Sequence, residues 1–438
     1  MRSAPLLALL ITTALAPGPA AGGSCTETDS LLLDDIAVID VRSGTVQANR
    51  DVVIRCDRIE AVRANREPGT ANASRRLDGR GRYVMPGLWD MHVHVLWDDA
   101  IAADLLPRFL AWGVTGIRDM GGDPVVTDRF RNRARSDPAA YPRIAAAGPM
   151  LDGPQPVHPG VSRSVKDAAE AVTTVESLAA HGTDFIKVYT LLPRDAFFAA
   201  AAAATRLGLP IAGHVPAEVT LAEAAAAGMA SMEHLRDELG QFCRPAPATA
   251  CDAAITAFSR NGTFHTPTLV TLRANSIPGY AESPPPELAG LPPSLRAEWN
   301  EQAARHRNDR DGGRFDDREA RFRHALALTA LLADRDIPLL AGTDAGNPFL
   351  VPGRSLHDEL EWLVRAGLSP AEALRAAVTA PADFLHEGET HGAVAPGFSA
   401  DLVILDANPL TGISNTRRLV AVVRAGQLVI DRSHQDGQ

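Results

Sequence analysis

The stretch DFIKVYTLLPRDAFFAAAAAATRLGLPIAGHVP, residues 184–216, decides the fold class. Its two ends, DFIKVYT and PIAGHVP, are short and mostly apolar, which is typical of β-strands in a buried sheet. Between them lies an alanine-rich run that closes on Gly208, which is typical of a helix rather than of a low-complexity linker. A helix between two such strands is the unit that builds a parallel sheet.

The same alternation continues in both directions from this stretch. Helical stretches separate the candidate strands, so eight units of strand and helix predict an α/β fold, a (β/α)8 TIM-like barrel, over residues 85–387. The candidate strands are 84–95, 113–120, 143–148, 184–190, 210–216, 230–235, 263–269 and 338–346.

Residues 271–322 interrupt the alternation with a polar segment that is rich in proline and charge. A long insertion after a barrel strand is usually a lid or a binding loop. One of its arginines could clamp a substrate carboxylate through two hydrogen bonds. Asp and Glu are interleaved, however, so a solvated charged helix and loop is the alternative. The arginines are Arg296, Arg305, Arg307, Arg310, Arg314, Arg318, Arg321 and Arg323.

The two chain ends are predicted to form β-structure without helices. Short apolar runs separated by turn residues fill 31–84, and ADLVILD and RLVAVVRAGQLVI follow near the C-terminus. We expect residues 24–84 and 388–438 to pair into one small β-sandwich domain.

Residues 1–23 have the features of a secretory signal peptide: Arg2, a short apolar run and then small residues. The protein is therefore expected to be exported, either to the periplasm or into the medium. Cys25 raises the alternative of a lipid anchor, although Gly22, Gly23 and Ser24 match a lipidation box poorly. No later segment is apolar enough to be a transmembrane helix.

Four cysteines fit an oxidising compartment. Cys243 and Cys251 bracket a proline-rich loop, so a local disulfide is expected there, and Cys25 with Cys56 would form the second. Four unpaired buried thiols are the alternative. The net charge of −10 and the absence of a long basic block give no reason to expect nucleic acid or an anionic membrane as a partner.

Unusual polar residues lie toward the C-terminal ends of five predicted strands, on the face of a barrel where active sites form. In DMHVHV the strand period of two points both imidazoles into one space. Each residue alone has an ordinary structural explanation, but six together at one barrel mouth indicate a functional site. They are His92, His94, Lys187, His214, His234 and Asp344.

The lysine is the most informative of the six. Of 43 Lys and Arg residues, only Lys166 and Lys187 are lysine, so the chain uses arginine almost everywhere else. A lysine inside an apolar strand is costly to bury unless something pairs with it.

The segments PGLWDMHVH, FIKVY, AGHVP, SMEHL and AGTDAG resemble the metal-dependent amidohydrolase superfamily, in its two-metal branch. The C-terminal AVAPGFSADLVILDANPL is similar to the same family's terminal sheet, so the resemblance covers nearly the whole mature chain. Within that branch the chain looks most like imidazolonepropionase-like members, which include dipeptidases and amidases acting on N-acylated amino acids.

The resemblance implies a ligand set. His92 and His94 would bind a first metal with Asp344, and His214 and His234 would bind a second. Lys187 would bridge the two after CO₂ has carboxylated its amine, a reaction that arginine cannot undergo because it stays protonated. Two divalent ions are implied, with zinc best suited to these ligands and Mn, Co or Fe left open.

The same resemblance implies the chemistry. The metals would share a water and supply hydroxide near neutral pH, with Lys187 and Asp344 as the catalytic residues. Asp344 would pass a proton to the leaving nitrogen. Tyr189, His158 and His265 are candidate substrate contacts, each with core packing or a plain loop position as the alternative. Asp119 is expected to be a supporting carboxylate.

The leading hypothesis is a secreted binuclear hydrolase that cleaves an amide in dipeptides or N-acyl amino acids, with a small-molecule substrate. The alternative keeps the site and changes the bond to a lactone, a cyclic amide or imide, or a phosphotriester, because the fold cannot choose among them. A non-catalytic metal-binding protein is a remote third. Relatives often assemble, so a homo-oligomer is left open.

Overall fold

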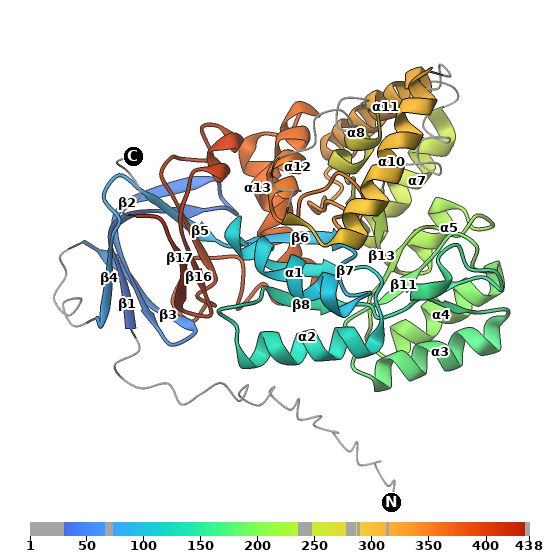
Figure 1. Ribbon diagram of the computed structural model, residues 1–438, viewed down its shortest axis with the longest axis horizontal. Coiled ribbons are helices and arrows are strands. Elements are labelled where there is room, and N and C mark those ends of the chain that lie inside the picture. Colours follow the sequence, from blue (N-terminus) through green and yellow to red (C-terminus); the bar gives the residue numbers. More distant parts are fainter. Residues whose placement is uncertain are drawn as a thin grey trace, which may run out of the picture.

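The computed structural model describes two parts, a barrel of strands and helices and a β-rich domain beside it (Figure 1). The predicted signal peptide, the lipidation alternative at Cys25 and the loop cysteine Cys243 lie outside the described residues. These are 30–65, 73–234, 248–276, 286, 290–311 and 315–433.

The barrel strands run parallel in two hydrogen-bonded groups, ordered β6-β7-β8 and β10-β9-β11-β12-β13-β14. Each is short and fully or largely buried, apart from the outer strand β10. The strands are β6 (Leu88–Val93), β7 (Val114–Asp119), β8 (Arg143–Ala146), β9 (Met150–Asp152), β10 (Ser162–Ser164), β11 (Ile186–Val188), β12 (Ile211–Gly213), β13 (Met229–Glu233) and β14 (Phe264–Thr266).

Two departures from regular strands occur where the groups join. The predicted third strand, 143–148, ends as β8 at Ala146, and a separate strand, β9, follows it. The Asp184 amide donates to Ala146 O at 3.0 Å, next to the start of β11. The predicted eighth strand forms isolated parallel bridges instead, Leu339 with His265 and Ala345 with Val93. These bridges link β14 to β6, so the eight-fold TIM-like arrangement is confirmed with one shortened and one bridged strand.

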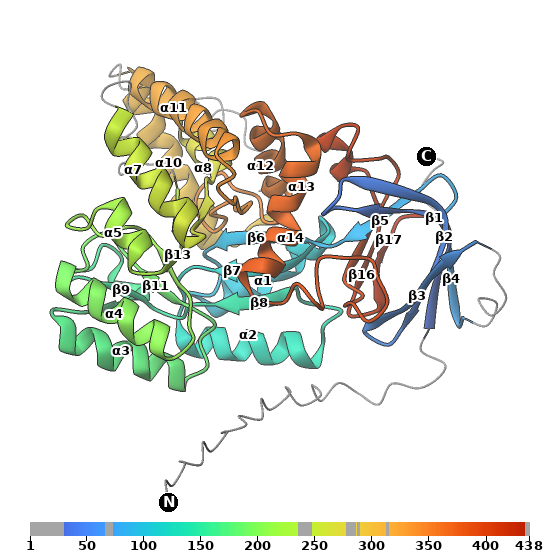
Figure 2. The same ribbon diagram turned by 180° about the vertical axis from the view of Figure 1, so that it is seen from behind.

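Helices surround these strands (Figure 2). The alanine run is confirmed as helix α4, and its buried small side chains pack against α3. Asp98, Asp123 and Asp167 cap the N-termini of α1, α2 and α3, which fixes where these helices begin. The helices are α1 (Asp99–Ala111), α2 (Pro124–Ser136), α3 (Ala168–Ala180), α4 (Arg194–Arg206), α5 (Leu221–Ala226), α7 (Ala248–Asn261), α12 (Arg354–Arg365), α13 (Pro370–Ala377) and α14 (Thr379–Phe384).

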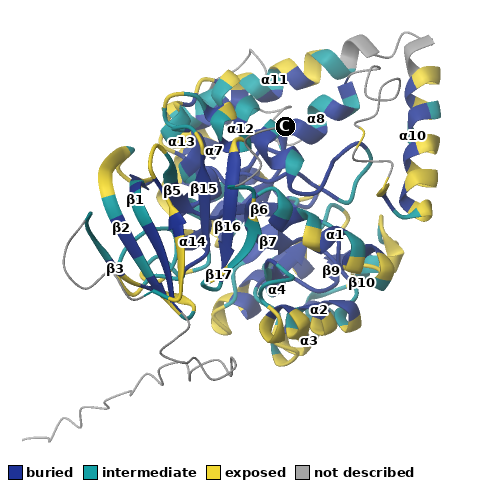
Figure 3. Ribbon diagram, turned by 60° about the vertical axis from the view of Figure 1, so that its left-hand side comes forward, coloured by how far each residue is buried: buried dark blue, intermediate teal, exposed yellow. Residues whose placement is uncertain are grey.

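The predicted insertion contains three further helices, α8 (Leu269–Ser276), α10 (Pro293–Asp311) and α11 (Phe315–Asp334). Figure 3 shows that α10 buries one face and exposes the other. Its buried Trp299 and His306 lie 5.5 Å and 5.3 Å from the Phe349 ring, between ring centroids. Phe349 follows Asp344 by five residues, so α10 packs next to the barrel mouth. Its role as a lid stays a prediction.

The two chain ends form one β-rich domain, as predicted. Its sheet has the order β17-β16-β15-β5-β1-β2-β3, with β4 on β1, and the pairing of β15 with β5 joins the two ends. The sheet has its own apolar core, separate from the barrel core. Its strands are β1 (Ser30–Asp40), β2 (Thr45–Arg55), β3 (Arg58–Ala64), β4 (Arg75–Asp78), β5 (Tyr83–Pro86), β15 (Leu402–Leu405), β16 (Leu419–Arg424) and β17 (Gln427–Asp431).

The described cysteines are oxidised. Cys56 and Cys251 are each disulfide-bonded, and no described cysteine is free. The alternative of unpaired thiols is therefore wrong for these two, while the predicted pairing stays a prediction. None of the helices among the described residues combines the length and the apolar character needed to cross a membrane.

Candidate metal centre

Three of the predicted ligands meet at the end of β6. His92 is on the strand and His94 directly follows it, and both rings approach the Asp344 carboxylate. His92 Nε2 lies 3.5 Å and His94 Nε2 lies 3.6 Å from Asp344 Oδ1. One ligand atom from each of the three residues falls within 4.8 Å of the others, which is close enough for one ion to bind all three.

The other two histidines continue this group. The His234 ring lies 4.6 Å from the His92 ring and 5.1 Å from the His214 ring, between centroids. The four predicted imidazoles therefore form one connected cluster. They come from the ends of β6, β12 and β13, which is the face of the barrel where active sites form.

Lys187 is the residue of this site that most needs an explanation. It is on β11, its side chain is fully buried, and its Nζ has no hydrogen-bond partner among the described residues. Burial lowers the pKa of Lys187 to about 8, although the carboxylates of Glu233 and Asp344 act in the opposite direction. The neutral amine that carboxylation by CO₂ requires is therefore far more populated near neutral pH than in an ordinary lysine.

The protonation states of the histidines fit metal binding. Burial and then the nearby Lys187 charge hold the pKa of His92 well below its ordinary value and lower the pKa of His94 to about 3. Both rings are thus neutral at pH 7, which is the form that binds metals. Neutral imidazoles, a carboxylate and a buried amine without a partner are a donor set suited to divalent ions.

The backbone is strained where it presents two of the ligands. His234 has φ of 66° and Asp344 has φ of 64°, in the left-handed region that non-glycine residues rarely adopt. Two glycines lie in contact with the ligand-bearing strands. A Cβ on Gly346 would lie 1.9 Å from His94 O, and a Cβ on Gly213 would lie 2.2 Å from Val188 O. Strain of this kind tends to collect at functional sites, where the surrounding structure enforces it.

A buried ion pair orients the first ligand. Glu233 Oε2 accepts a hydrogen bond from His92 Nδ1 at 2.8 Å, which directs Nε2 toward Asp344. Arg118 Nη2 donates to both oxygens of Glu233 at 2.9 Å, and Ser231 also donates to this carboxylate. Such partners fix the tautomer and the ring orientation of a ligating histidine.

The two histidines of the second predicted metal position each have a threonine hydroxyl as partner. His214 Nδ1 lies 2.9 Å from Thr190 Oγ1, and His234 Nδ1 lies 2.7 Å from Thr268 Oγ1. Asp119 supports the loop after His94, as expected: its Oδ2 accepts from Val95 and Leu96 amides at 2.8 Å and 3.1 Å. The rings of His92, His214 and His234 thus each have a fixed partner, and the loop after His94 is held by Asp119.

Two of the three predicted substrate contacts lie together beside the cluster. The Tyr189 ring stacks on the His214 ring at 4.1 Å between centroids, and His158 Nε2 lies 3.2 Å from the Tyr189 hydroxyl. The third, His265, is corrected in position. Its ring is fully buried against Phe258 of α7, 4.4 Å between centroids, because the next residue, Thr266, faces Arg118 inside the barrel.

Sequence reasoning missed Glu233 and Arg118. Both carry a charge on a predicted strand. On β13, Ser231 and Glu233 share the inward face, and the apolar residues between and beside them point the other way. A buried charge at such a position needs a partner. This pattern could have identified each residue as a buried charge in need of a partner. It could not show that they pair with each other, because 115 residues separate them.

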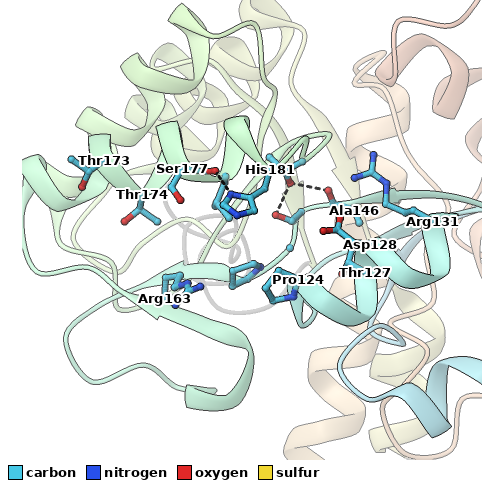
Figure 4. A pocket seen from close by; sticks show the side chains of 15 residues that line it. Pro124, Thr127, Asp128, Arg131, Ala146, Arg163, Thr173, Thr174, Ser177 and His181 are labelled. Carbon is cyan, nitrogen blue, oxygen red and sulfur yellow. Dashed lines mark hydrogen bonds between the residues drawn. The ribbon is translucent and has the colours of Figure 1, made fainter.

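A cavity of about 230 Å³ lies outside the barrel, between α2 and α3 (Figure 4). Its lining includes Asp128, Arg131, Arg163 and His181, with Arg131 already paired with Asp184 at 2.8 Å. None of the six predicted metal ligands lines it, so we place the chemistry at the barrel mouth.

Comparison with known proteins agrees with this geometry. A bottromycin amidohydrolase structure is 29% identical, with 92% of this chain and 88% of that chain covered and a TM-score of 0.75. A Xaa-Pro dipeptidase structure with bound methionine is 20% identical, covers 91% of this chain and 99% of that chain and has a TM-score of 0.71, which shows the shared fold.

A curated relative, the adenine deaminase of Rubrobacter xylanophilus, is 22% identical over 413 residues. That match covers 92% of this chain, but the chain spans only 57% of the length of the deaminase. The family model for the Amidohydrolase family matches residues 83–429, which include the whole candidate site. The chain therefore belongs to the amidohydrolase family.

Proposed function

We propose that the protein is a binuclear metal-dependent hydrolase that cleaves an amide bond in dipeptides or N-acyl amino acids. The observation that carries the proposal is Lys187, a buried amine without a hydrogen-bond partner whose charge interacts with those of His92, His94 and Asp344. A buried ammonium group without a hydrogen bond is costly, because it has lost its hydration and gains only the longer-range attraction of nearby carboxylates. Conversion to a carbamate would replace it with an anion that has two ligand oxygens.

His92, His94 and Asp344 would hold one ion, His214 and His234 the other, and the carbamate of Lys187 would bridge them. Zinc suits this set of nitrogen and oxygen ligands. Two divalent ions bound there would polarise the substrate carbonyl and lower the pKa of a shared water toward neutrality.

Asp344 is the residue positioned to move protons. Its carboxylate lies within 3.6 Å of two ligand nitrogens, so it adjoins the place where water and substrate meet. It would accept a proton from the attacking water and donate it to the leaving nitrogen, as a general base and then a general acid. The hydroxyl of Tyr189 and the ring of His158 would orient the substrate beside the second pair of ligands.

The substrate class rests on similarity and on the family. Of the structures that share this fold, one is named a Xaa-Pro dipeptidase and another a bottromycin amidohydrolase, so their names indicate a dipeptide and an amide as substrates. We also propose that the enzyme acts outside the cytoplasm, because residues 1–23 have the pattern of a signal peptide and Cys56 and Cys251 are oxidised.

The test is hydrolysis of a mixed library of dipeptides and N-acyl amino acids by the zinc-loaded protein in the presence of bicarbonate, with free amino acids measured. Release that is lost in Lys187→Arg would support the proposal and identify the preferred side chain. No release from protein with two bound metals would overturn the amide assignment and direct the search to lactones, cyclic amides and phosphotriesters.

A further inference from the structure

Several exposed apolar side chains follow the C-terminal ends of barrel strands. In the described part of the chain, six large apolar residues are exposed, and four of them follow the C-terminal ends of barrel strands. Single exposed apolar residues are ordinary, but a group on one face of a molecule marks a binding surface. The four are Trp97, Val125, Val157 and Leu191.

Val157 and Leu191 are held outward by the same buried carboxylate. Asp152 is fully buried at the end of β9, where its Oδ2 accepts from the Val157 amide at 2.8 Å and its Oδ1 accepts from the Leu191 amide at 2.8 Å. Both side chains nevertheless remain 47% exposed. The two loops are thus fixed by a strong internal contact, and their apolar side chains are left facing solvent.

The loops that carry these side chains also carry the pair beside the metal ligands. Val157 precedes His158, and Leu191 follows Tyr189 by two residues, while His158 and Tyr189 are hydrogen-bonded at 3.2 Å. On the other side of the mouth, Trp97 Nε1 donates to the backbone oxygen of His94 at 3.1 Å. Val157 and Leu191 are therefore sequence neighbours of His158 and Tyr189, and Trp97 is hydrogen-bonded to the backbone of His94.

The two loops that carry Val157 and Leu191 favour an uncharged substituent on the substrate. Residues 153–162 and 188–193 contain no Asp, Glu, Lys or Arg. A charged substituent would lose water there without gaining an ion pair, whereas an apolar one would be buried favourably.

We propose that Val157 and Leu191, together with Trp97, form an apolar rim that binds an apolar group of the substrate as it extends from the scissile amide. This inference rests on the proposed function and narrows its substrate class to amides that carry a sizeable apolar substituent. The substituent can be the acyl chain or the side chain of the released amino acid, and the experiment separates the two.

The test compares two substrate series. One holds glycine constant and lengthens the acyl group from acetyl through butanoyl to hexanoyl. The other holds acetyl constant and changes the amino acid from glycine through leucine to phenylalanine. In one of the series kcat/KM is expected to rise with apolar size, by up to about fourfold for each methylene that becomes buried. The series that rises identifies the source of the apolar group.

The variant Val157→Ala/Leu191→Ala is expected to reduce the ratio of kcat/KM between the largest and smallest members of that series by about tenfold, mainly through KM. The control is Leu207→Ala, an exposed apolar residue just after α4 and outside the rim, and it should leave the ratio unchanged. A ratio that stays the same in the double variant, or a preference for small or charged substrates, would overturn the rim.

A binding measurement separates failure of the rim from failure of the proposed function. In the background of Asp344→Asn, calorimetry compares N-hexanoylglycine and N-acetylphenylalanine with N-acetylglycine. One of the two larger compounds should bind more tightly than N-acetylglycine, and that difference should be lost in the rim variant. Binding that depends on the rim without hydrolysis by the wild type would retain the rim and reject amide hydrolysis. Hydrolysis by the wild type that does not depend on the rim would retain amide hydrolysis and reject the rim.

Discussion

His92 and Glu233 are joined by a buried hydrogen bond of 2.8 Å between Nδ1 and Oε2, although 141 residues separate them in the chain. The bond leaves Nε2 of His92 as the nitrogen that faces Asp344. A histidine ligand held in this way needs no rearrangement to bind a metal. The preorganisation of the first metal position therefore depends on a residue that touches no metal itself.

Glu233→Gln is expected to weaken metal binding at this position by ~10–100-fold, because an amide cannot both accept from His92 and balance Arg118 in the same way. Metal affinity should be measured by competition with a chelator, together with kcat. Glu301→Gln, on the exposed face of α10, is the control and should bind metal normally. Unchanged affinity in Glu233→Gln would show that the His92 ring is held by packing alone.

Arg118→Met tests the ion pair as a structural unit. Arg118 is fully buried, with its guanidinium 5.5 Å and 4.7 Å from the ring centroids of Phe185 and Phe384. Its loss leaves the Glu233 charge buried without its cation, which should cost ~3–5 kcal/mol of the free energy of unfolding. Arg206→Met removes the exposed pair with Glu176 and should cost less than ~1 kcal/mol. Denaturant unfolding measures both variants. An equal loss of unfolding free energy in Arg118→Met and Arg206→Met would contradict the claim that burial makes the Arg118–Glu233 pair costly to break.

Lys187→Ala is expected to lower kcat at least ~100-fold and to remove the bridging ligand. Acetate or propionate added to this variant should restore part of the activity, since a free carboxylate can occupy the space of the carbamate. Lys166→Ala is the matched control, because Lys166 is the other lysine of the chain and lies on the surface beside Glu170. A Lys187→Ala enzyme with normal activity would exclude a bridging role.

Glu359 gives a prediction for stability against pH. It is fully buried on α12 and accepts from the Val270 amide at the start of α8 at 2.7 Å, and burial raises its pKa to about 8. Because the folded pKa lies above the unfolded value, the stability linked to the protonated group is complete below about pH 4.5 and declines as pH rises to about 8.

Glu359→Gln removes this titration. Relative to the wild type, the variant should therefore gain about 4 kcal/mol of unfolding free energy between pH 5 and pH 8.5. The measurement is urea unfolding of both proteins at the two pH values. A constant difference between the variant and the wild type across this range would show that the carboxyl group does not titrate there.

The barrel and its polar strand ends could be predicted from the sequence, because alternation of strands and helices and a strand period of two are local properties. His92 and His94 illustrate this, since their spacing alone points both rings into the site. The same period explains the placement of His265. Thr266 faces the interior, so its neighbour on the strand must face the helices.

What the sequence could not show are contacts between distant residues. The Arg118–Glu233 pair and the Asp152 contacts to two separate loops depend on which strands become neighbours. The eighth strand also looked regular in sequence, but Asp344 adopts a positive φ at its end, and the segment pairs only through isolated bridges. Local patterns predict elements, whereas ligand orientation arises from tertiary packing.

The most direct test of the central claim is the metal content of the protein after removal of metals and reconstitution with zinc and bicarbonate, measured by elemental analysis. Four histidines, Asp344 and a carboxylated Lys187 predict two zinc ions per chain, falling to one or fewer in Lys187→Ala. A wild-type protein that saturates at one ion, or a Lys187→Ala protein that still binds two, would contradict a binuclear centre bridged by this lysine.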